Sequence, residues 1–455
     1  MNITTLPAYL PNTYKFDILD DLKIEIEVTH NPFALSLQAL FAMAARQNPK
    51  RSFLFVSKIL GKHLPVDPSV SLLGGALLAY LYNNLVNPSD IELEPTIAGA
   101  IFDQQKALGL YSALQQQPFV LEQPTLFIGF AETATALGHS MFNCFAKGAH
   151  FIQTTRDLDL DQKPQIRFAE EHSHAVAHYC YGLERGSFVG DKTVVLVDDE
   201  ITTGKTALNI IREIQASFPK QEYVVASLLD WRSDEDKQRF KQLEAELDIK
   251  IRTISLLSGK ITVTGKLKEE KSPLINTNKE IQKAESKWKQ YDFPYLGNTG
   301  RFGLSCEDKE ELENYIIQVA EYLRQGRQGK RILCLGNGEF MYHPMRIASH
   351  MGPGVFFQST TRSPIKPAQN EGYIIQSRLV YPSPDDPAVS NYLYNVPHGH
   401  YDELYMFLER EVSKERITPL LKALNTLGVP RCFIVVCGSS TLEGSNYVDC
   451  VNRGA

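Results

Sequence analysis

Apolar and polar positions along the chain predict buried strands that alternate with amphipathic helices. Residues 194–197 are four consecutive apolar residues, and residues 207–217 carry apolar side chains at helical spacing. An uninterrupted apolar run of this kind is typical of a parallel strand covered on both faces. The same order of strand and helix recurs at 125–138, 223–246 and 331–350. The pattern therefore predicts an α/β protein with a parallel sheet flanked by helices.

The remaining pattern divides the chain into two α/β domains. Further strands are expected at 22–28 and 51–57, and helices at 32–46, 72–85, 98–115, 308–327 and from about 174 to 178. Residues 266–300 are rich in lysine and polar residues and then contain proline and glycine, which is typical of a linker. We expect a first domain at 1–265, a linker at 266–300 and a second α/β domain at 301–455.

Composition fits a protein of two or more domains, since the chain has 455 residues, of which 43% are hydrophobic and 22% charged. The net charge of −6 argues against general nucleic-acid binding. Seven scattered cysteines without a Cys-x-x-Cys pair favour a reducing cytoplasm over a disulfide framework. Neither a signal peptide nor an apolar run of membrane-spanning length is expected, so we predict a cytoplasmic protein with no membrane partner.

Two carboxylates, Asp198 and Asp199, follow the strand 194–197 and precede the run Thr202–Thr206 at the start of a helix. Ligands of open α/β sheets bind at the carboxyl ends of the strands. Backbone N–H groups and hydroxyls at a helix N-terminus suit a phosphate group, whereas the carboxylates suit ribose hydroxyls or water bound to Mg²⁺. The run therefore predicts a site for a sugar phosphate, with Asp198 and Asp199 as the metal-binding residues.

Three other interpretations compete for this run. A nucleotide-binding P-loop needs glycine where Asp199 stands, so that interpretation fails. A Walker B strand also has an apolar run and acids, but no Walker A motif precedes it. The third interpretation is an ordinary buried strand, followed by a turn that an aspartate side chain stabilises.

Other residues that suit an anion lie at neighbouring strand ends. The small-residue turn Phe130–Thr133 permits close approach of backbone N–H groups, Arg156 ends the next strand, and Lys58 ends the strand 51–57. An unoccupied turn and a solvated strand end are the alternatives for the turn and for Lys58. A polar segment, 157–172, follows Arg156.

Three histidines, His172, His174 and His178, have a spacing that a zinc ion tolerates. On a helix only the last two share a face, so we favour a helix end whose side chains, Glu170 and His172 among them, reach into the site.

The run 194–206 resembles the signature of type I phosphoribosyltransferases without a gap. The resemblance implies that Thr202, Thr203, Gly204, Lys205 and Thr206 hold the 5′-phosphate of phosphoribosyl pyrophosphate (PRPP), that Phe130, Ala131, Glu132 and Thr133 hold its pyrophosphate, and that Lys58 belongs to an N-terminal hood near the pyrophosphate. Threonine at the third position after the two acids is similar to orotate-type enzymes.

Such an enzyme transfers ribose 5-phosphate to a base-like acceptor with release of pyrophosphate and depends on Mg²⁺. The resemblance implies catalytic roles for Asp198, Asp199, Arg156, Glu170 and His172, and closure of the segment 157–172 over the site. It singles out no general base. The alternatives are a regulatory protein that senses PRPP or a nucleotide without turnover, and an enzyme that cleaves a nucleotide at the same site. A homodimer is one assembly that the resemblance allows.

The sequence Thr-Arg-Ser-Pro at 361–364 matches the motif that names the TRSP domain. Together with 53–63, 127–135, 170–175 and 338–342, it resembles bacterial proteins encoded among tellurite-resistance and stress genes, in which this domain follows a phosphoribosyltransferase domain. That resemblance implies nucleotide metabolism, with a nucleoside-like metabolite as the product.

The second half also repeats features of the first. Gly129 precedes Arg156 by 27 positions, and Gly336 precedes Arg362 by 26, each pair spanning a strand, a turn, a helix and a strand. We therefore consider the hypothesis that the C-terminal half is a degenerate copy of the phosphoribosyltransferase fold, with a second pocket around Gly336, Glu339 and Arg362. In that hypothesis the apolar strand at 431–441 corresponds to the strand that carries Asp198 and Asp199, but it has no such pair of acids.

Overall fold

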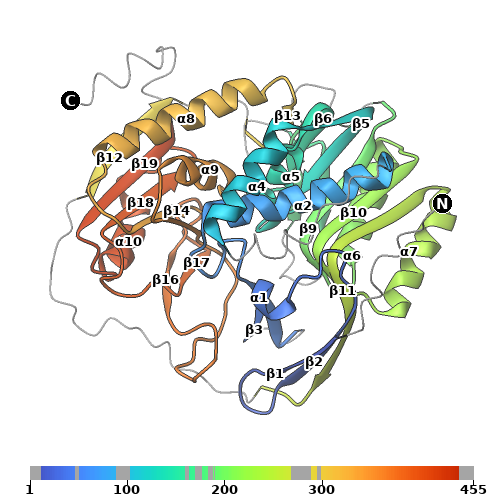
Figure 1. The fold of residues 1–455 in the computed structure, drawn as a ribbon, viewed down its shortest axis with the longest axis horizontal. Helices are drawn as coiled ribbons and strands as arrows, with labels where there is room; N and C mark the ends of the chain where they lie inside the picture. The colour runs from blue at the N-terminus through green and yellow to red at the C-terminus, as the bar shows by residue number, and fades with distance from the viewer. Residues whose placement is uncertain are drawn as a thin grey trace. The chain divides into compact units, whose positions relative to one another are not determined.

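The computed structural model (Figure 1) divides the chain into two compact units. It describes residues 12–46, 51–88, 103–158, 163–169, 177–182, 188, 190–267, 288–294 and 299–439. The N-terminal unit comprises residues 1–41, 72–266 and 300–306, and the C-terminal unit comprises 42–71, 267–299 and 307–455. Each unit therefore includes a segment that lies within the other's stretch of sequence.

The N-terminal unit is built on one eight-stranded mixed sheet of order β1-β2-β11-β10-β9-β5-β6-β13. Its strands are β1 (Asn12–Asp17), β2 (Lys23–His30), β5 (Phe119–Gly129), β6 (Phe145–Gln153), β9 (Thr193–Ile201), β10 (Glu222–Asp230), β11 (Lys250–Thr264) and β13 (Leu304–Ser305). The five strands from β11 to β6 are parallel, as the apolar runs predict, whereas β1, β2 and β13 pair antiparallel. The parallel centre is apolar because helices cover both faces of such a sheet.

Helices connect these strands. They are α1 (Leu37–Leu40), α2 (Pro68–Val86), α4 (Gln104–Gln116), α5 (Ala134–Phe142), α6 (Lys205–Ser217) and α7 (Asp234–Leu247). A hairpin of β7 (Ile166–Ala169) and β8 (Ala177–Cys180) stands between β6 and β9. Gly75 of α2 lies against α5, where a Cβ atom at this glycine would come within 2.4 Å of Ser140.

Among the described residues, α2 alone has the length and apolar composition to cross a membrane, which corrects the expectation that no apolar run is long enough. Of its most apolar window, 72% is buried within the fold. A buried core helix has the same composition, since it must be apolar on most of its faces.

The C-terminal unit contains a parallel five-stranded sheet of order β12-β19-β18-β14-β15. Its strands are β12 (Trp288–Pro294), β14 (Ile332–Gly336), β15 (Val355–Ser359), β18 (Glu403–Leu408) and β19 (Arg431–Ser439). The helices are α8 (Lys309–Gly326), α9 (Tyr342–His350) and α10 (Lys414–Asn425), and two hairpins are formed by β3 (Phe41–Ala45) with β4 (Phe53–Ser57) and by β16 (Arg378–Pro382) with β17 (Ser390–Tyr394).

The two sheets share one strand order. β10-β9-β5-β6 in the first unit corresponds to β19-β18-β14-β15 in the second, and α5, a hairpin and α6 correspond in sequence order to α9, a hairpin and α10. This agreement supports the hypothesis of a second copy. It corrects one detail: the strand at 431–439 stands in the place of β10, and β18 stands in the place of the acid-bearing β9.

Each unit completes its sheet edge with a segment that is distant in sequence. In the N-terminal unit, Leu304 pairs with Phe151 of β6, and the backbone N–H of Gln153 donates to the carbonyl of Gly300 at 2.7 Å. In the C-terminal unit, Val66 bridges to Phe357 of β15, and the N–H of Ser359 donates to the carbonyl of Gly61 at 2.6 Å. In both units the edge strand of the sheet therefore pairs with a short segment that is distant in sequence.

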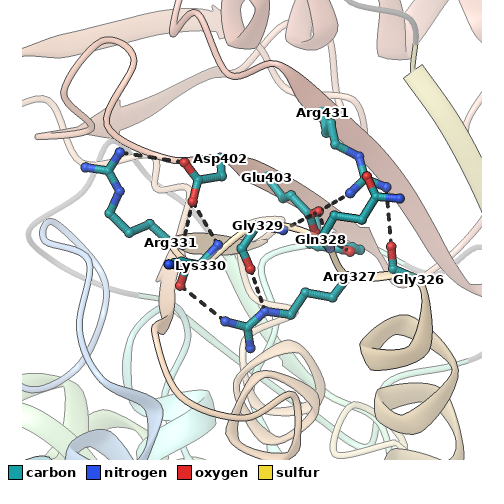
Figure 2. Close-up of polar contacts among 10 residues, drawn as sticks. Gly326, Arg327, Gln328, Gly329, Lys330, Arg331, Asp402, Glu403 and Arg431 are labelled. Atoms are coloured by element: carbon teal, nitrogen blue, oxygen red, sulfur yellow. Dashed lines mark hydrogen bonds and ion pairs between the residues drawn. The ribbon is translucent and has the colours of Figure 1, made fainter.

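A buried carboxylate fixes the turn from α8 to β14 (Figure 2). Glu403 accepts the backbone N–H groups of Gln328 and Gly329 at 2.8 and 2.9 Å and also pairs with Arg431. Asp402 accepts the next two N–H groups, those of Lys330 and Arg331, at 2.8 Å each. The turn thus satisfies donors that would otherwise be costly to desolvate.

Two predicted helices are wrong. Residues 32–46 form only the four-residue α1 before the chain extends into β3, where it pairs with β4. His178 lies in strand β8, paired with Phe168 of β7, and not on a helix. In both cases pairing with the other strand of a hairpin outweighs the local helical pattern.

Candidate functional site

The carboxylates Asp198 and Asp199 lie in the last residues of β9, where the strand leaves the sheet centre. The preceding residues 194–197 are completely buried, whereas Asp198, Asp199 and Glu200 are half-buried. The backbone N–H of Asp199 donates to Oδ1 of Asp198 at 2.9 Å, which orients that carboxylate. The apolar strand thus positions two acids at the sheet edge where ligands bind.

The turn at 202–204 leads directly into α6. Gly204 is the residue that precedes the helix, with a φ of +71°, and its carbonyl accepts the N–H of Leu208 at 3.0 Å. The N–H of Lys205 lies 3.4 Å from the hydroxyl oxygen of Thr203. The N-terminal end of a helix carries partial positive charge, so this turn suits a phosphate group.

A buried ion pair supports this turn, and sequence reasoning missed it. The Arg232 guanidinium binds Asp230 through two hydrogen bonds of 2.9 and 2.7 Å and lies 4.3 Å from the ring centroid of Phe240. A Cβ atom at Gly204 would come within 2.4 Å of the same ring. The available signal was the pair of charged residues at the end of the apolar strand β10.

The turn Phe130–Thr133 lies beside the acid-bearing strand. The N–H of Phe130 donates to the carbonyl of Val197 at 3.0 Å, so the turn begins one residue from Asp198 in the adjacent strand. The N–H of Ala131 donates to the hydroxyl of Thr154 at 2.8 Å, and the peptide between Ala131 and Glu132 is cis. All four residues of the turn are buried.

Arg156 joins a small polar cluster at the end of β6. Its Nε lies 3.4 Å from Nε2 of His178, and Nδ1 of His178 lies 3.4 Å from the Thr154 hydroxyl. If Nε2 accepts from Arg156, then Nδ1 carries the proton and donates to Thr154, whose hydroxyl can accept two donors. The cluster links Arg156 to the turn at 130–133.

Arg301, from the segment that completes the sheet edge, contacts the residues on either side of Arg156. Its guanidinium donates to the Thr155 hydroxyl at 2.5 Å and lies 3.8 Å from the carboxylate of Asp157. Thr154 and Arg301 were not predicted, because their roles depend on contacts between distant segments.

The structure brings together most of the predicted residues of the first site: Asp198, Asp199, Thr202–Thr206, Phe130–Thr133 and Arg156. Glu170 and His172, with His174, lie outside the described residues. Lys58 follows β4 and belongs to the C-terminal unit, so its predicted role at the pyrophosphate stays a prediction. Within the described ranges no group of three or more histidine, cysteine or acidic residues could hold a metal ion, and the metal site predicted at Asp198 and Asp199 stays a prediction.

The three residues predicted for the second pocket follow the carboxyl ends of adjacent strands. Gly336 ends β14, Glu339 is buried in the turn after it, and Arg362 follows β15.

Comparison with known families agrees with this arrangement. A family described as phosphoribosyl transferase matches residues 40–260. A second, described as the TRSP domain C-terminal to that transferase, matches residues 298–424. These matches identify a phosphoribosyltransferase domain. In this chain it is followed by a TRSP domain.

Solved structures of adenine phosphoribosyltransferases are similar to part of the chain. The enzyme from Giardia lamblia, complexed with 9-deazaadenine, is 15% identical with a TM-score of 0.27, over 49% of this chain and 94% of that one. The enzyme from Trypanosoma brucei is 15% identical with a TM-score of 0.25, over 43% and 86%. That from Leishmania donovani is 17% identical with a TM-score of 0.25, over 40% and 79%. No curated protein matches the chain.

Proposed function

We propose that the N-terminal unit transfers ribose 5-phosphate from PRPP to a base-like acceptor and releases pyrophosphate. One observation carries the proposal: two turns suited to phosphate groups flank the two acids and are joined to them through the paired strands β5 and β9. The hydrogen bond from Phe130 to Val197 at 3.0 Å fixes the relative position of one turn and the acids. A ligand with an anionic group at each end of a ribose would place one anionic group at each turn and the ribose at the acids.

Each group has a separate role in the proposed reaction. The turn at 202–206 and the start of α6 bind the 5′-phosphate, and Asp198 and Asp199 accept hydrogen bonds from the ribose hydroxyls. The turn at 130–133 and Arg156 bind the pyrophosphate. Donors that face the leaving group stabilise the charge that develops on it, which is where electrostatic catalysis acts most strongly.

The residues present fit a Mg²⁺ ion. Magnesium in phosphate-handling sites is held by one or two carboxylates together with substrate phosphates, and Asp198 and Asp199 supply such a pair. When bound, the ion would neutralise charge on the pyrophosphate.

The transfer breaks the bond between the anomeric carbon and the pyrophosphate oxygen and forms a bond from that carbon to the acceptor. The expected transition state resembles an oxocarbenium ion, as in glycoside chemistry. Water must be excluded, because it would compete with the acceptor. Closure of the segment 157–172 over the site stays a prediction, because residues 159–162 and 170–172 lie outside the described ones.

The first test is calorimetric titration of the purified protein with PRPP, with and without Mg²⁺, followed by a screen of bases for pyrophosphate release. Asp198→Asn should lower turnover about 100-fold or more, since it removes a charge that acts at the reacting sugar. Asp17→Asn is the matched control, because Asp17 is an 83% exposed side chain on β1.

Full turnover by folded Asp198→Asn would refute the assignment. PRPP binding without turnover on any base would favour a regulatory sensor.

A further inference from the structure

The C-terminal unit reproduces the contacts around the proposed pyrophosphate turn. In the first unit, the N–H of Ala131 donates to the Thr154 hydroxyl at 2.8 Å, and the N–H of Thr154 donates to the Gly129 carbonyl at 2.9 Å. In the second unit, Gly338 donates to the Thr360 hydroxyl at 2.9 Å, and Thr360 donates to the Gly336 carbonyl at 3.0 Å. The turn and its anchoring threonine are therefore retained.

The hairpin beside this turn is retained as well. Thr155 and Tyr179 exchange backbone hydrogen bonds in the first unit, and Thr361 and Tyr392 do so in the second. A guanidinium lies 5.8 Å from the corresponding tyrosine ring in both units, from Arg167 on Tyr179 and from Arg378 on Tyr392. Arg362 directly follows Thr361, as Arg156 follows Thr155.

The first of the two acids and the residues of the phosphate loop are not retained. Gly129 pairs with Val197 and Gly336 pairs with Phe407, so the strand register places Leu408 where Asp198 stands and Glu409 where Asp199 stands. Helix α10 begins after Val412 and Ser413, in place of the Thr-Thr-Gly turn. The ribose pair and the 5′-phosphate turn are thus lost, while the turn at the other end of the site remains.

Two features at this turn point to a ligand. Gly338 has a φ of +56°, and a Cβ atom built on it would meet nothing within 4 Å, so the turn is open above its backbone. Asn391 immediately precedes Tyr392 and so stands where His178 does in the first unit. It is 1% exposed, and among the described residues its side-chain oxygen has no hydrogen-bond partner. A buried acceptor without a partner is costly, and a donor on the ligand, such as a hydroxyl group of an ester, would satisfy it.

We infer that the C-terminal unit binds a phosphate or diphosphate ester at its own sheet edge, through the turn 336–339, Arg362 and Arg378. Two guanidinium groups and open backbone favour an oxyanion. Because Leu408 and the short turn before α10 replace the groups for the ribose and the second phosphate, the ligand is held at one end only. This site is separate from the transfer site, and the inference does not depend on the transfer reaction.

Inorganic pyrophosphate is the probe, and its binding to the full chain is measured by equilibrium dialysis. Arg156→Ala weakens the proposed first site, so a further loss of binding caused by a substitution at the second turn in this background reports the second site. Adding Gly338→Asn should weaken that remaining binding about tenfold or more, because the new side chain fills the open space while asparagine tolerates a positive φ. Arg362→Gln should have a similar effect without a change in the backbone.

The controls are matched to each change. Gly399→Asn alters a glycine with a φ of +64° and open space around it, and Arg324→Ala removes an exposed guanidinium of α8; both should leave binding unchanged. Competition by inorganic phosphate and by ribose 5-phosphate separates a free anion from an ester. No binding by Arg156→Ala, or binding that persists in both Gly338→Asn and Arg362→Gln, would overturn the inference. If binding at the first site alone is absent, the proposed transfer reaction is contradicted and the inferred second site is not.

Discussion

Single buried charges determine how well the C-terminal unit is held together. Glu403 is fully buried and receives two backbone N–H groups as well as Arg431 (Figure 2), and the Tyr405 hydroxyl donates to its second oxygen at 2.9 Å. Glu403→Gln removes the charge and turns one acceptor into a donor. We expect a loss of about 2–4 kcal/mol in the free energy of unfolding, measured by urea denaturation.

Glu321→Gln is the matched control, because Glu321 is an exposed partner of Arg324 at 3.9 Å. Such pairs contribute about 0–1 kcal/mol. Equal effects of the two substitutions would contradict the role given to Glu403.

A buried histidine makes stability depend on pH. Burial lowers the pKa of His343 from 6.5 to about 4. Because the unfolded chain binds the proton more readily, the stabilisation is complete above pH 6.5 and falls as the pH drops toward 4, by up to about 3 kcal/mol. Burial alone would raise the pKa of Glu313, but His350 and Arg346 lower it to about 2, so this carboxylate favours folding down to about pH 4.5.

The free energy of unfolding measured from pH 7.5 to 4.5 should therefore decline in the natural protein. The decline should be smaller in His343→Gln, which cannot take up the proton. An identical decline in both proteins would assign the effect to other groups, such as His63, whose pKa burial also lowers.

At the scale of elements, the junction between β9 and α6 depends on one glycine. Gly204 has a positive φ and lies against Phe240, so Gly204→Ala introduces both strain and a contact of 2.4 Å. In the proposed function this turn holds the 5′-phosphate, and we expect PRPP affinity to fall about tenfold or more, since a shift of the turn misaligns its donors.

Gly190→Ala is the control for Gly204→Ala in a calorimetric titration. Gly190 also has a positive φ, of +84°, but a Cβ atom there would meet nothing within 4 Å. Similar loss of affinity in both variants would show that the effect is not specific to the turn before α6.

Elements were predictable where one local signal dominated. The apolar run 194–197 predicted β9, because a strand buried on both faces is apolar at every position. The helical spacing of 207–217 predicted α6, because a helix buried on one face is apolar only every three or four residues. The helix expected at 32–46 failed because residues 41–45 pair with β4. His178 was likewise assigned to a helix but pairs in β8, where it links Thr154 to Arg156.

At the scale of the whole molecule, sequence order and compact units differ. Residues 301–306 were expected in the second domain, yet together with residue 300 they complete the N-terminal sheet, where Arg301 is buried against Thr155. A fragment of residues 1–306 should therefore be more stable than a fragment of residues 1–297. We expect a difference of about 4–8 °C in melting temperature, equivalent to about 2 kcal/mol.

Leu304→Asp within the longer fragment is the control. Leu304 is buried in β13, so the charge should abolish the pairing with β6 and return the melting temperature to that of the shorter fragment. Equal melting temperatures of all three fragments would show that the edge segment does not stabilise the unit.

The sequence by itself determined the fold class, the phosphoribosyltransferase signature at 194–206 and the repeated spacing of Gly129–Arg156 and Gly336–Arg362. These features are local, since each is a run of residue types or a distance along the chain. Tertiary structure alone decided that β18 is the counterpart of β9, that His178 contacts Thr154 beside the turn at 130–133, and that Arg301 reaches Thr155. Strand order, register and the pairing of distant segments are set by hydrogen bonds and packing between residues far apart in sequence. Such contacts leave no local pattern in an amino-acid sequence.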